Sequence, residues 1–466
     1  MFQYAKSLWF DHSFKMNPPI KWAIFEFVVP QWAPGLSIPY TPLLAILSHT
    51  FFHNDTSIRQ IPSPTLPNYE QTLLHDPAYV YCSVLNPAIT ALTTTILYLL
   101  CVELGLPKKR AVAIALTFGL ISPAAVYSKL DFAQPLFSLF VIAGFLLLLK
   151  ASKEQGVLCL MLSGVSFGLA ILSRSEFMIF TPILVFAVCF MPPWKAVLNP
   201  YGLAERVKKV FAFILPLCVM VVINQAITFL KFGTWLNTGY PIASLLVFRL
   251  SHWTTAFAGN LISPGRGILV FFPISLLSVV GIRRFIAINS WFAATTVTFL
   301  FATLAFYPFW RTWDAGMSWG PRYLIPIVPY LCLLGYLALP PKLGPNYKVL
   351  MGILLAVCAI DTLQGLLFDF LHFYASLQLS SDQLDQQYYH FSIFASPLFV
   401  GWRDLLHPES FDIKWLQPGT GGFKLIFPLF GLLSLLILGK VWLNFFRSPQ
   451  TDLERTFELS GNLLHK

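Results

Sequence analysis

The segment 310–322 carries the residue types that best fit a reaction site. It reads Trp-Arg-Thr-Trp-Asp-Ala-Gly-Met-Ser-Trp-Gly-Pro-Arg and joins the apolar runs 285–306 and 323–339. An arginine side chain is a planar donor that suits phosphate, and Asp314 can accept a proton or a sugar hydroxyl. Trp319 has the amphipathic ring that favours a membrane interface. We predict that this link forms one wall of a site at the membrane surface; an interfacial belt of aromatic rings and arginines is the alternative interpretation.

Two arginines each follow glycine and proline just before an apolar run. Arg266 lies in Ile-Ser-Pro-Gly-Arg-Gly, and Arg322 follows Gly-Pro. Free backbone N–H groups and the dipole at a helix N-terminus add to such a cation in binding an anion. We therefore predict a pair of phosphate-binding positions that suit a diphosphate or a phosphodiester, with Arg249 of the acid-free loop 231–267 as a further candidate. The alternative for Arg266 is a tight turn that contacts lipid headgroups.

Two short polar turns between apolar runs supply further candidates. The turn Ser-Lys-Leu-Asp contains Lys129 and Asp131, and the turn Arg-Ser-Glu contains Arg174 and Glu176. Asp131 is the candidate catalytic carboxylate, and its alternative role is to cap a helix predicted at 132–150. Lys129, Arg174 and Glu176 are candidate substrate-binding residues, although a local ion pair or a headgroup contact also explains the second turn.

Composition defines the elements that must position these residues. The chain has 466 residues, of which 56% are hydrophobic and only 11% charged, and its mean hydropathy is +0.67. Runs of about 20 apolar residues predict an all-α, polytopic helical membrane protein and not a barrel of short alternating strands. About eleven transmembrane helices are expected, at 81–104, 111–127, 132–150, 157–173, 177–193, 210–230, 268–282, 285–306, 323–339, 349–370 and 423–444.

The distribution of Lys and Arg predicts the orientation of these helices. Alternate links are basic, which places them and the tail 445–466 in the cytoplasm. The opposite, external face then receives 1–80, a Pro-rich region with a predicted interfacial helix at 39–52, and the loops 231–267, 307–322 and 371–422. The formal charge of +10 is split among links and forms no stripe, so no nucleic-acid partner is expected. The core is expected to span 81–370, followed by 371–422 and the last helix at 423–444.

Other readings of the sequence stay open. Asp361 lies deep in an apolar run and favours a transporter or lipid flippase, because carboxylates are costly in lipid. His49 and His53 have a metal-ligand spacing without a third ligand at defined spacing. The sequence identifies no certain cofactor and leaves a divalent metal open. It contains no GxxxxGK[ST] pattern, which disfavours an ATP-driven transporter.

The motifs described above resemble those of one enzyme group. The segments at 261–273, Leu-Ile-Ser-Pro-Gly-Arg-Gly-Ile-Leu-Val-Phe-Phe-Pro, and at 313–326, Trp-Asp-Ala-Gly-Met-Ser-Trp-Gly-Pro-Arg-Tyr-Leu-Ile-Pro, resemble bacterial glycosyltransferases of superfamily C. That group uses polyprenyl-phosphate sugars and includes protein O-mannosyltransferases and lipid A aminoarabinose transferases. The turns at 128–135 and 173–176 lie where the group carries polar turns between helices.

The resemblance implies a glycosyltransferase of the bacterial inner membrane whose active site faces the external or periplasmic side. Its expected partners are a polyprenyl-phosphate-linked sugar, membrane lipid and a lipid, glycan or protein acceptor. Asp131 would act as general base, and Arg266 and Arg322 would hold the departing phosphate. The family's main acid normally follows its first helix, which is absent here. We therefore expect that this chain begins late, with an inactive remnant as an alternative.

Overall fold

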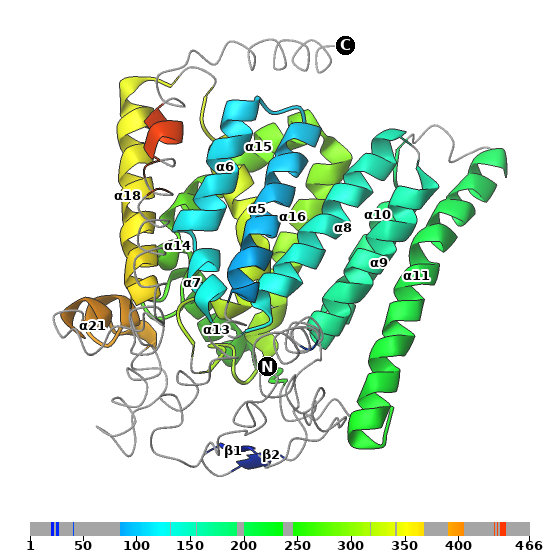
Figure 1. Ribbon diagram of the computed structural model, residues 1–466, viewed down its shortest axis with the longest axis horizontal. Helices are drawn as coiled ribbons and strands as arrows, with labels where there is room; N and C mark the ends of the chain where they lie inside the picture. Colours follow the sequence, from blue (N-terminus) through cyan, green and yellow to red (C-terminus); the bar gives the residue numbers. More distant parts are fainter. Residues whose placement is uncertain are drawn as a thin grey trace, which may run out of the picture.

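The computed structural model describes the parts of the chain that form its helical bundle (Figure 1). The described residues are 84–130, 132–154, 156–192, 200–235, 246–316, 318–340, 343–367, 390–404 and 439–443, with the short pieces 20–22 and 25–27 and positions 41, 433 and 436. The fold is all-α. A small antiparallel hairpin pairs Ile20–Trp22 (β1) with Phe25–Phe27 (β2), with Ile20 opposite Phe27. The helix predicted at 39–52 and the tail 445–466 lie outside the described residues, apart from position 41.

Several helices are long and apolar enough to cross a membrane, so the chain is an integral membrane protein. Among the described residues five meet this test by length and composition, and a bent pair adds a sixth if it forms one span. The five are α5 (Leu85–Glu103), α8 (Gln134–Glu154), α11 (Pro200–Phe232), α16 (Ser290–Phe306) and α18 (Pro345–Leu367). The bent pair is α6 (Lys108–Ile121) with α7 (Pro123–Lys129).

Shorter helices complete the bundle. They are α9 (Val157–Ser173), η2 (Ser175–Phe180), α10 (Thr181–Cys189), α13 (Leu250–Ile262), α14 (Ile268–Phe271), η4 (Pro273–Leu277), α15 (Ser278–Ile288), η5 (Tyr307–Phe309), η6 (Arg322–Ile327), α17 (Val328–Leu337) and α21 (Pro397–Asp404). The expected number of about eleven spans is therefore not confirmed. The span predicted at 423–444 is described at only a few positions; there, the Nε1 of Trp442 donates to the hydroxyl of Tyr336 at 3.1 Å.

Prolines and caps break runs that hydropathy alone reads as continuous. Pro123 has no N–H to donate, and α6 and α7 meet at a 50° bend where Ser122 caps the second helix. Pro273 likewise ends α14 after four residues, so the predicted span 268–282 is divided among α14, η4 and α15. The predicted boundary at Arg283 and Arg284 falls inside α15; the chain turns instead at Asn289, whose side chain accepts from the backbone N of Phe292 at 2.9 Å.

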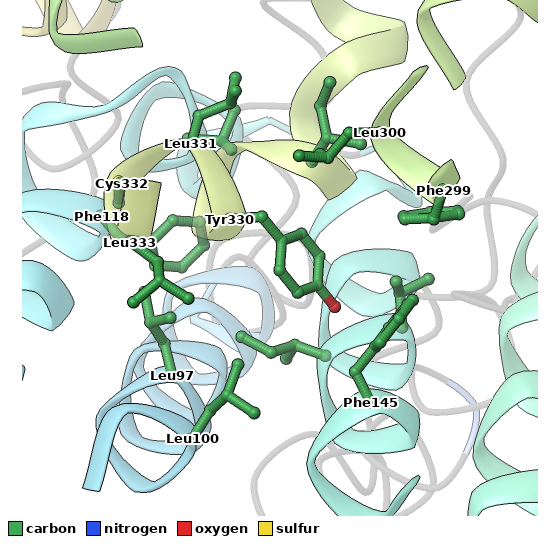
Figure 2. Close-up of a cluster of buried hydrophobic side chains, with 14 of the residues drawn as sticks. Leu97, Leu100, Phe118, Phe145, Phe299, Leu300, Tyr330, Leu331, Cys332 and Leu333 are labelled. Atoms are coloured by element: carbon green, nitrogen blue, oxygen red, sulfur yellow. The ribbon is translucent and has the colours of Figure 1, made fainter. Parts of the chain in front are cut away.

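The helices pack closely around an aromatic core. Figure 1 shows α11 at the outer edge of the bundle beside α9. In the interior, Tyr330 of α17 lies 5.2 Å from Phe145 of α8 and 6.3 Å from Phe299 of α16, measured between ring centroids (Figure 2). Small residues allow the close crossings expected of membrane helices. At Gly281 of α15, an added Cβ would overlap the carbonyl oxygen of Leu334 in α17.

Replacement of Gly281 with Ala is therefore expected to lower stability. The new methyl group would meet backbone rather than a movable side chain, and overpacking of this kind costs about 1–3 kcal/mol. The measurement is thermal unfolding in detergent. Gly352→Ala in α18 is the matched control, because nothing lies within 4 Å of its added Cβ. Equal melting temperatures for the two variants would contradict a close contact between α15 and α17.

Hydrogen bonds show which links share an end of the bundle. Arg110 donates to the carbonyl of Leu339 at 2.9 Å, and Arg284 donates to the same carbonyl and to that of Leu337. Basic residues at the start of α6 and within α15 thus meet at the C-terminal end of α17. The turn η6 precedes α17 and begins with Arg322 at the opposite end of the bundle. The polar turns that contain Lys129 and Arg174 lie at that same end. The predicted alternation of the links between two faces, and the assignment of one face to the cytoplasm, stay predictions.

Candidate functional site

The link 310–322 folds into a loop with left-handed backbone positions. Ala315 and Gly316 both have φ of 63°, and Gly320 has φ of 55°. An L-residue with a Cβ is strained in this region, so Ala315 must be held there by its surroundings. At Gly320 an added Cβ would lie 2.8 Å from the ring of Phe271. The loop therefore needs contacts from outside itself to keep this conformation.

Arg266 supplies those contacts. Its side chain is only 1% exposed, and its guanidinium points into the loop. Nη1 donates to the carbonyl of Ser318, to the Ser318 hydroxyl at 3.1 Å and to the carbonyl of Gly320 at 3.1 Å, while Nη2 donates to the carbonyl of Gly316. The backbone N of Arg266 donates to the Ser263 hydroxyl at 3.0 Å, which fixes the turn that presents the side chain. We call this set of bonds the Arg266 clasp.

The helices that begin at Arg266 and Arg322 are shorter or less regular than predicted. The helix after Arg266 is the four-residue α14, and Arg322 begins the six-residue 3-10 turn η6. Pro273 ends α14 after four residues, whereas η6 continues directly into α17, so that one helix runs from Arg322 to Leu337. The expected contribution of a helix dipole is therefore small at Arg266 and stays a prediction at Arg322. A direct phosphate contact by Arg266 stays a prediction, but its hydrogen bonds give it a positioning role.

Arg322 and Arg174 meet around one amide. Gln134, at the start of α8, is 1% exposed, and its side-chain amide faces both arginines. Because both guanidinium groups are donors, the amide is assigned with its oxygen toward them, which then accepts from Nε of Arg322 at 3.0 Å and from Nη1 of Arg174 at 2.7 Å. The Arg322 guanidinium lies 3.9 Å from the centroid of the Phe132 ring, a cation–π geometry. We call Arg174 and Arg322 the arginine pair.

The arginine pair has one carboxylate and two stacked rings beside it. Glu176 forms an ion pair with Arg174, and both side chains are 14% exposed. Burial alone would lower the pKa of Arg174, but the charge of Glu176 and the neighbouring phenols raise it above its ordinary value. Tyr323 stacks on Tyr307 at 4.6 Å, and the Arg174 guanidinium lies 5.4 Å from the Tyr323 ring. The pair is therefore permanently cationic, although Glu176 offsets part of its charge.

Asp314 has a partner that the sequence did not indicate. Its Oδ2 lies 2.9 Å from Nε2 of His390, and both side chains are buried. Burial would raise the pKa of Asp314, yet the His390 hydrogen bond and the charge of Arg266 lower it below its ordinary value. Burial and Arg266 lower the pKa of His390 despite Asp314. Near neutral pH, an Nε2–H of neutral His390 therefore donates to an ionised carboxylate.

Trp319 is buried within the bundle. Its side chain is 1% exposed. Its Nε1 donates to Oε1 of Gln364 at 3.1 Å, and its carbonyl accepts from the Tyr127 hydroxyl at 2.6 Å. Its ring meets Phe271 edge to face at 4.8 Å. The residue therefore anchors the end of the loop by packing, and its predicted part in a substrate site stays a prediction.

The turn that holds Lys129 and Asp131 is fixed on both sides. Asn86 donates to the carbonyl of Leu130 at 2.6 Å and to that of Phe132 at 3.3 Å, and Lys129 donates to the carbonyl of Leu366 at 3.0 Å. Asp131, the predicted catalytic residue, lies outside the described residues, as do His49 and His53. Among the described side chains, no group of three or more His, Cys, Asp or Glu is arranged to hold a metal ion. A catalytic role for Asp131 and a metal requirement stay untested.

The structure thus brings together most of the predicted side chains from separate turns. Arg266 and Arg322 donate to the adjacent carbonyls of Gly316 and Ala315, the second at 3.5 Å, so they flank the same turn of the loop. Arg174 and Glu176 join Arg322 through Gln134. The exposed Arg249 precedes the first turn of α13 and is not part of this hydrogen-bonded group.

Comparisons with known proteins identify no family for the chain. No family model and no curated protein matches the chain. Among solved structures, the chain is similar to the apo form of the Archaeoglobus fulgidus oligosaccharyltransferase, with 11% sequence identity and a TM-score of 0.40. The similarity covers 92% of this chain and 55% of that chain, so the chain spans about half the length of that structure. At this level of similarity, function must be inferred from the chain's own residues.

Proposed function

We propose that this protein is a membrane glycosyltransferase that moves a sugar from a polyprenyl-phosphate donor to an acceptor on the external face. The observation that carries the proposal is the convergence of Arg174 and Arg322 on Gln134. Two guanidinium groups, both only partly exposed, form a cationic centre at the end of membrane-spanning helices. A phosphate at that position would have its lipid tail in the bilayer and its sugar toward the polar turns. The motifs at 261–273 and 313–326 give independent support.

The proposed reaction is a displacement at the anomeric carbon. An acceptor hydroxyl or amine attacks that carbon, and the bond between the carbon and the phosphate oxygen breaks with its electron pair on the phosphate. The proton of the acceptor passes to a carboxylate, for which Asp131 is the candidate. The phosphate changes from a diester with one negative charge to a monoester that carries more. Arg174 and Arg322 would stabilise this growing charge, which is where such cations contribute most to rate.

The surrounding residues would hold the pair and the donor in place. The Arg266 clasp fixes the loop from which Arg322 follows, and Asn86 and Lys129 fix the turn that carries Asp131. Asp314 and Trp319 act within the loop, through His390 and Gln364 respectively. In this proposal they support the site, whereas Glu176 moderates the charge of Arg174.

Substitution of Arg322 with Gln tests the proposal. The amide keeps a polar side chain but removes the positive charge, so binding of polyprenyl phosphate should weaken about tenfold or more, as expected for the loss of a charge-assisted contact. The probe is polyprenyl phosphate added to purified protein in nanodiscs, with the corresponding polyprenol as the uncharged reference. Arg174→Gln should act in the same direction.

The control for these variants is Arg283→Gln. Arg283 has the same side chain, is exposed, and lies in α15 beside Arg284, at the opposite end of the bundle. This variant should bind polyprenyl phosphate as the wild type does. Wild-type protein that binds the phosphate lipid and the polyprenol equally would remove the basis of the proposal.

Asp361 is the one described feature that favours transport instead. It is a carboxylate 9% exposed in α18, a helix long enough to span a membrane. Buried acids in such helices often mark proton pathways. Uptake into proteoliposomes that depends on a pH gradient and is abolished in Asp361→Asn, with glycosyl transfer absent, would favour this second function.

A further inference from the structure

We propose that the segment 390–404 is an interfacial element whose exposed apolar face enters the headgroup region of the bilayer while its opposite face holds the turn that presents Arg266. The segment begins at His390 and ends with the helix α21 (Pro397–Asp404). The partner of its exposed face is membrane lipid. The inference goes beyond the proposed function and does not depend on it, because it concerns how one segment lies against the membrane.

The buried face of the segment is bonded to the turn 263–267. The carbonyl of His390 accepts from the backbone N of Gly265 at 3.0 Å, and the Ser396 hydroxyl donates to the carbonyl of Pro264 at 2.6 Å. His390 and Ser396 are both buried. Two separate points of the segment are thus fixed to the backbone just before Arg266, and the position of the segment helps to set the position of that turn.

The other face of the segment is apolar and uncovered. The twelve residues between His390 and Arg403 include no charged side chain. The large apolar side chains of this face are 40% to 76% exposed, and they are Phe391, Ile393, Phe394, Phe399 and Trp402. The rings of Phe394 and Phe399 meet edge to face at 5.5 Å, and Trp402 lies three residues after Phe399, on the same side of α21. A contiguous exposed patch of this kind marks contact with a membrane or with another protein.

The neighbouring surface identifies the partner as lipid. The 23-residue α18 is long and apolar enough to cross a membrane. It exposes a stripe of apolar residues at helical spacing, namely Ile353, Val357, Ile360 and Leu363. Gln364, the next residue, donates from Nε2 to the carbonyl of Pro397 at 2.8 Å, so the stripe ends where α21 begins. The exposed face of the segment therefore continues the surface that a membrane-spanning helix presents to lipid.

The direction of α21 agrees with a place in the membrane interface. Figure 1 shows α21 lying across the end of α18 instead of continuing along its axis. An interfacial helix lies in the plane of the bilayer with its apolar face about 5–10 Å into the boundary between headgroups and acyl chains. The ring of Trp402 is amphipathic and favours that boundary. Insertion of this face would restrain the segment, and through it the turn 263–267.

A photo-reactive side chain at position 394 identifies what covers this face. Full-length protein carrying Phe394→p-benzoylphenylalanine is placed in nanodiscs of phosphatidylethanolamine and phosphatidylglycerol and irradiated, and its adducts are identified by mass. We expect a lipid adduct as abundant as that of Ile360→p-benzoylphenylalanine in the exposed stripe of α18. The control is Thr312→p-benzoylphenylalanine, at an exposed polar position of the 310–322 loop, which should yield far less lipid adduct.

Three outcomes of this experiment would overturn the inference. Equal yields of lipid adduct at positions 394 and 312 would mean that exposure alone explains the labelling. A cross-link from position 394 to a second copy or to another segment of the same chain would show that protein covers the face. The third outcome is the absence of any adduct at position 394 under conditions that label position 360.

Phe394→Asp measures what insertion does for the turn 263–267. A carboxylate is costly at the boundary with the acyl chains, so the segment should leave the bilayer and its hold on the turn should weaken. Exchange of the Gly265 amide, measured in nanodiscs, should accelerate about tenfold, as expected for the lost burial of one phenylalanine side chain. Leu158→Asp is the matched control, because Leu158 is 67% exposed at the start of α9, at the opposite end of the bundle from Arg174.

The control should leave exchange at Gly265 unchanged. Equal exchange in Phe394→Asp and Leu158→Asp would show that the bilayer does not hold the segment against the turn, and the inference would fail. Neither experiment measures binding of a phosphate lipid, so failure here leaves the proposed function standing. Failure of Arg322→Gln to weaken binding of polyprenyl phosphate would, in turn, leave the interfacial role of 390–404 standing.

Discussion

Replacement of Arg266 with Leu is expected to release the 310–322 loop and to abolish function. The leucine side chain would leave the carbonyls of Gly316, Ser318 and Gly320 without the guanidinium to which they now bond. It would also remove the positive charge that lowers the pKa of Asp314. A hydrogen bond to a charged group contributes about 1.5–3 kcal/mol, and several such bonds would be lost together. The strained backbone at Ala315 adds to the tendency of the loop to open.

Trypsin provides a direct measurement of this release. Arg311 is exposed in the loop and is a cleavage site, so its rate of cutting reports how often the loop opens. Cleavage after Arg311 should accelerate in Arg266→Leu by about tenfold for each 1.4 kcal/mol lost. The cleavage rate of Arg266→Lys should lie between those of the wild type and Arg266→Leu, because an ammonium keeps the charge but lacks the planar guanidinium that reaches several carbonyls. The exposed Arg283→Leu serves as control.

The same variants distinguish the positioning role of Arg266 from the phosphate contact predicted by its sequence context. If Arg266 only holds the loop, cleavage and affinity for polyprenyl phosphate should change in parallel in the Leu and Lys variants. If it contacts phosphate, Arg266→Lys should keep much of the affinity while the loop opens. Unchanged cleavage in Arg266→Leu would refute the clasp itself.

The sequence predicted the parts of the site that local chemistry specifies. Glycine and proline around Arg266 and Arg322 mark turns, and both turns exist. Charged residues between apolar runs, such as Arg174 and Glu176, must lie at the ends of helices, and they meet Arg322 there. These predictions depend only on the exclusion of charged residues and turn-forming residues from the interior of membrane-spanning helices.

The sequence did not predict the partners of these residues. Gln134 and His390 are single polar residues without a repeating spacing, and their importance arises from segments that meet only in the folded chain. His390 is 76 residues from Asp314, and Gln134 is 40 from Arg174. Hydropathy also overlooked the breaks at Pro123 and Pro273, because proline changes hydrogen bonding more than it changes the mean polarity of a window. The predicted spans were therefore drawn across breaks that only backbone hydrogen bonding reveals.

Replacement of His390 with Phe is expected to detach the segment 390–404 from the site. The imidazole donates to Asp314 at 2.9 Å, and the His390 carbonyl accepts from the backbone N of Gly265 at 3.0 Å. The phenylalanine ring would leave the buried Asp314 carboxylate without this donor. A hydrogen bond to a charged group contributes about 1.5–3 kcal/mol. Hydrogen exchange of the Gly265 amide measures detachment, and its protection factor should fall about tenfold or more in the variant.

The wild-type contact should also weaken in acid, and the sign follows from the two pKa shifts. The pKa of His390 is lowered from 6.5 by burial and by Arg266, so a detached imidazole takes up a proton more readily than the bound one. Protection at Gly265 should therefore be constant above pH 6.5 and fall below it, by at most about tenfold per pH unit for one proton. Asp314, whose pKa is lowered from 3.8, stabilises the contact above that value and loses this effect only as the pH falls further.

Glutamine at position 390 identifies the responsible group. Gln keeps a donor for Asp314 but does not titrate, so His390→Gln should retain protection at Gly265 without the decline below pH 6.5. An identical decline in that variant would assign the pH dependence elsewhere. Asp314 lies between His390 and the Arg266 clasp. Protonation of His390 should therefore also weaken the contacts that hold the 310–322 loop. Acid should then speed cleavage after Arg311 in the wild type and leave His390→Gln unchanged, which would establish that segment 390–404 and the loop open as one unit.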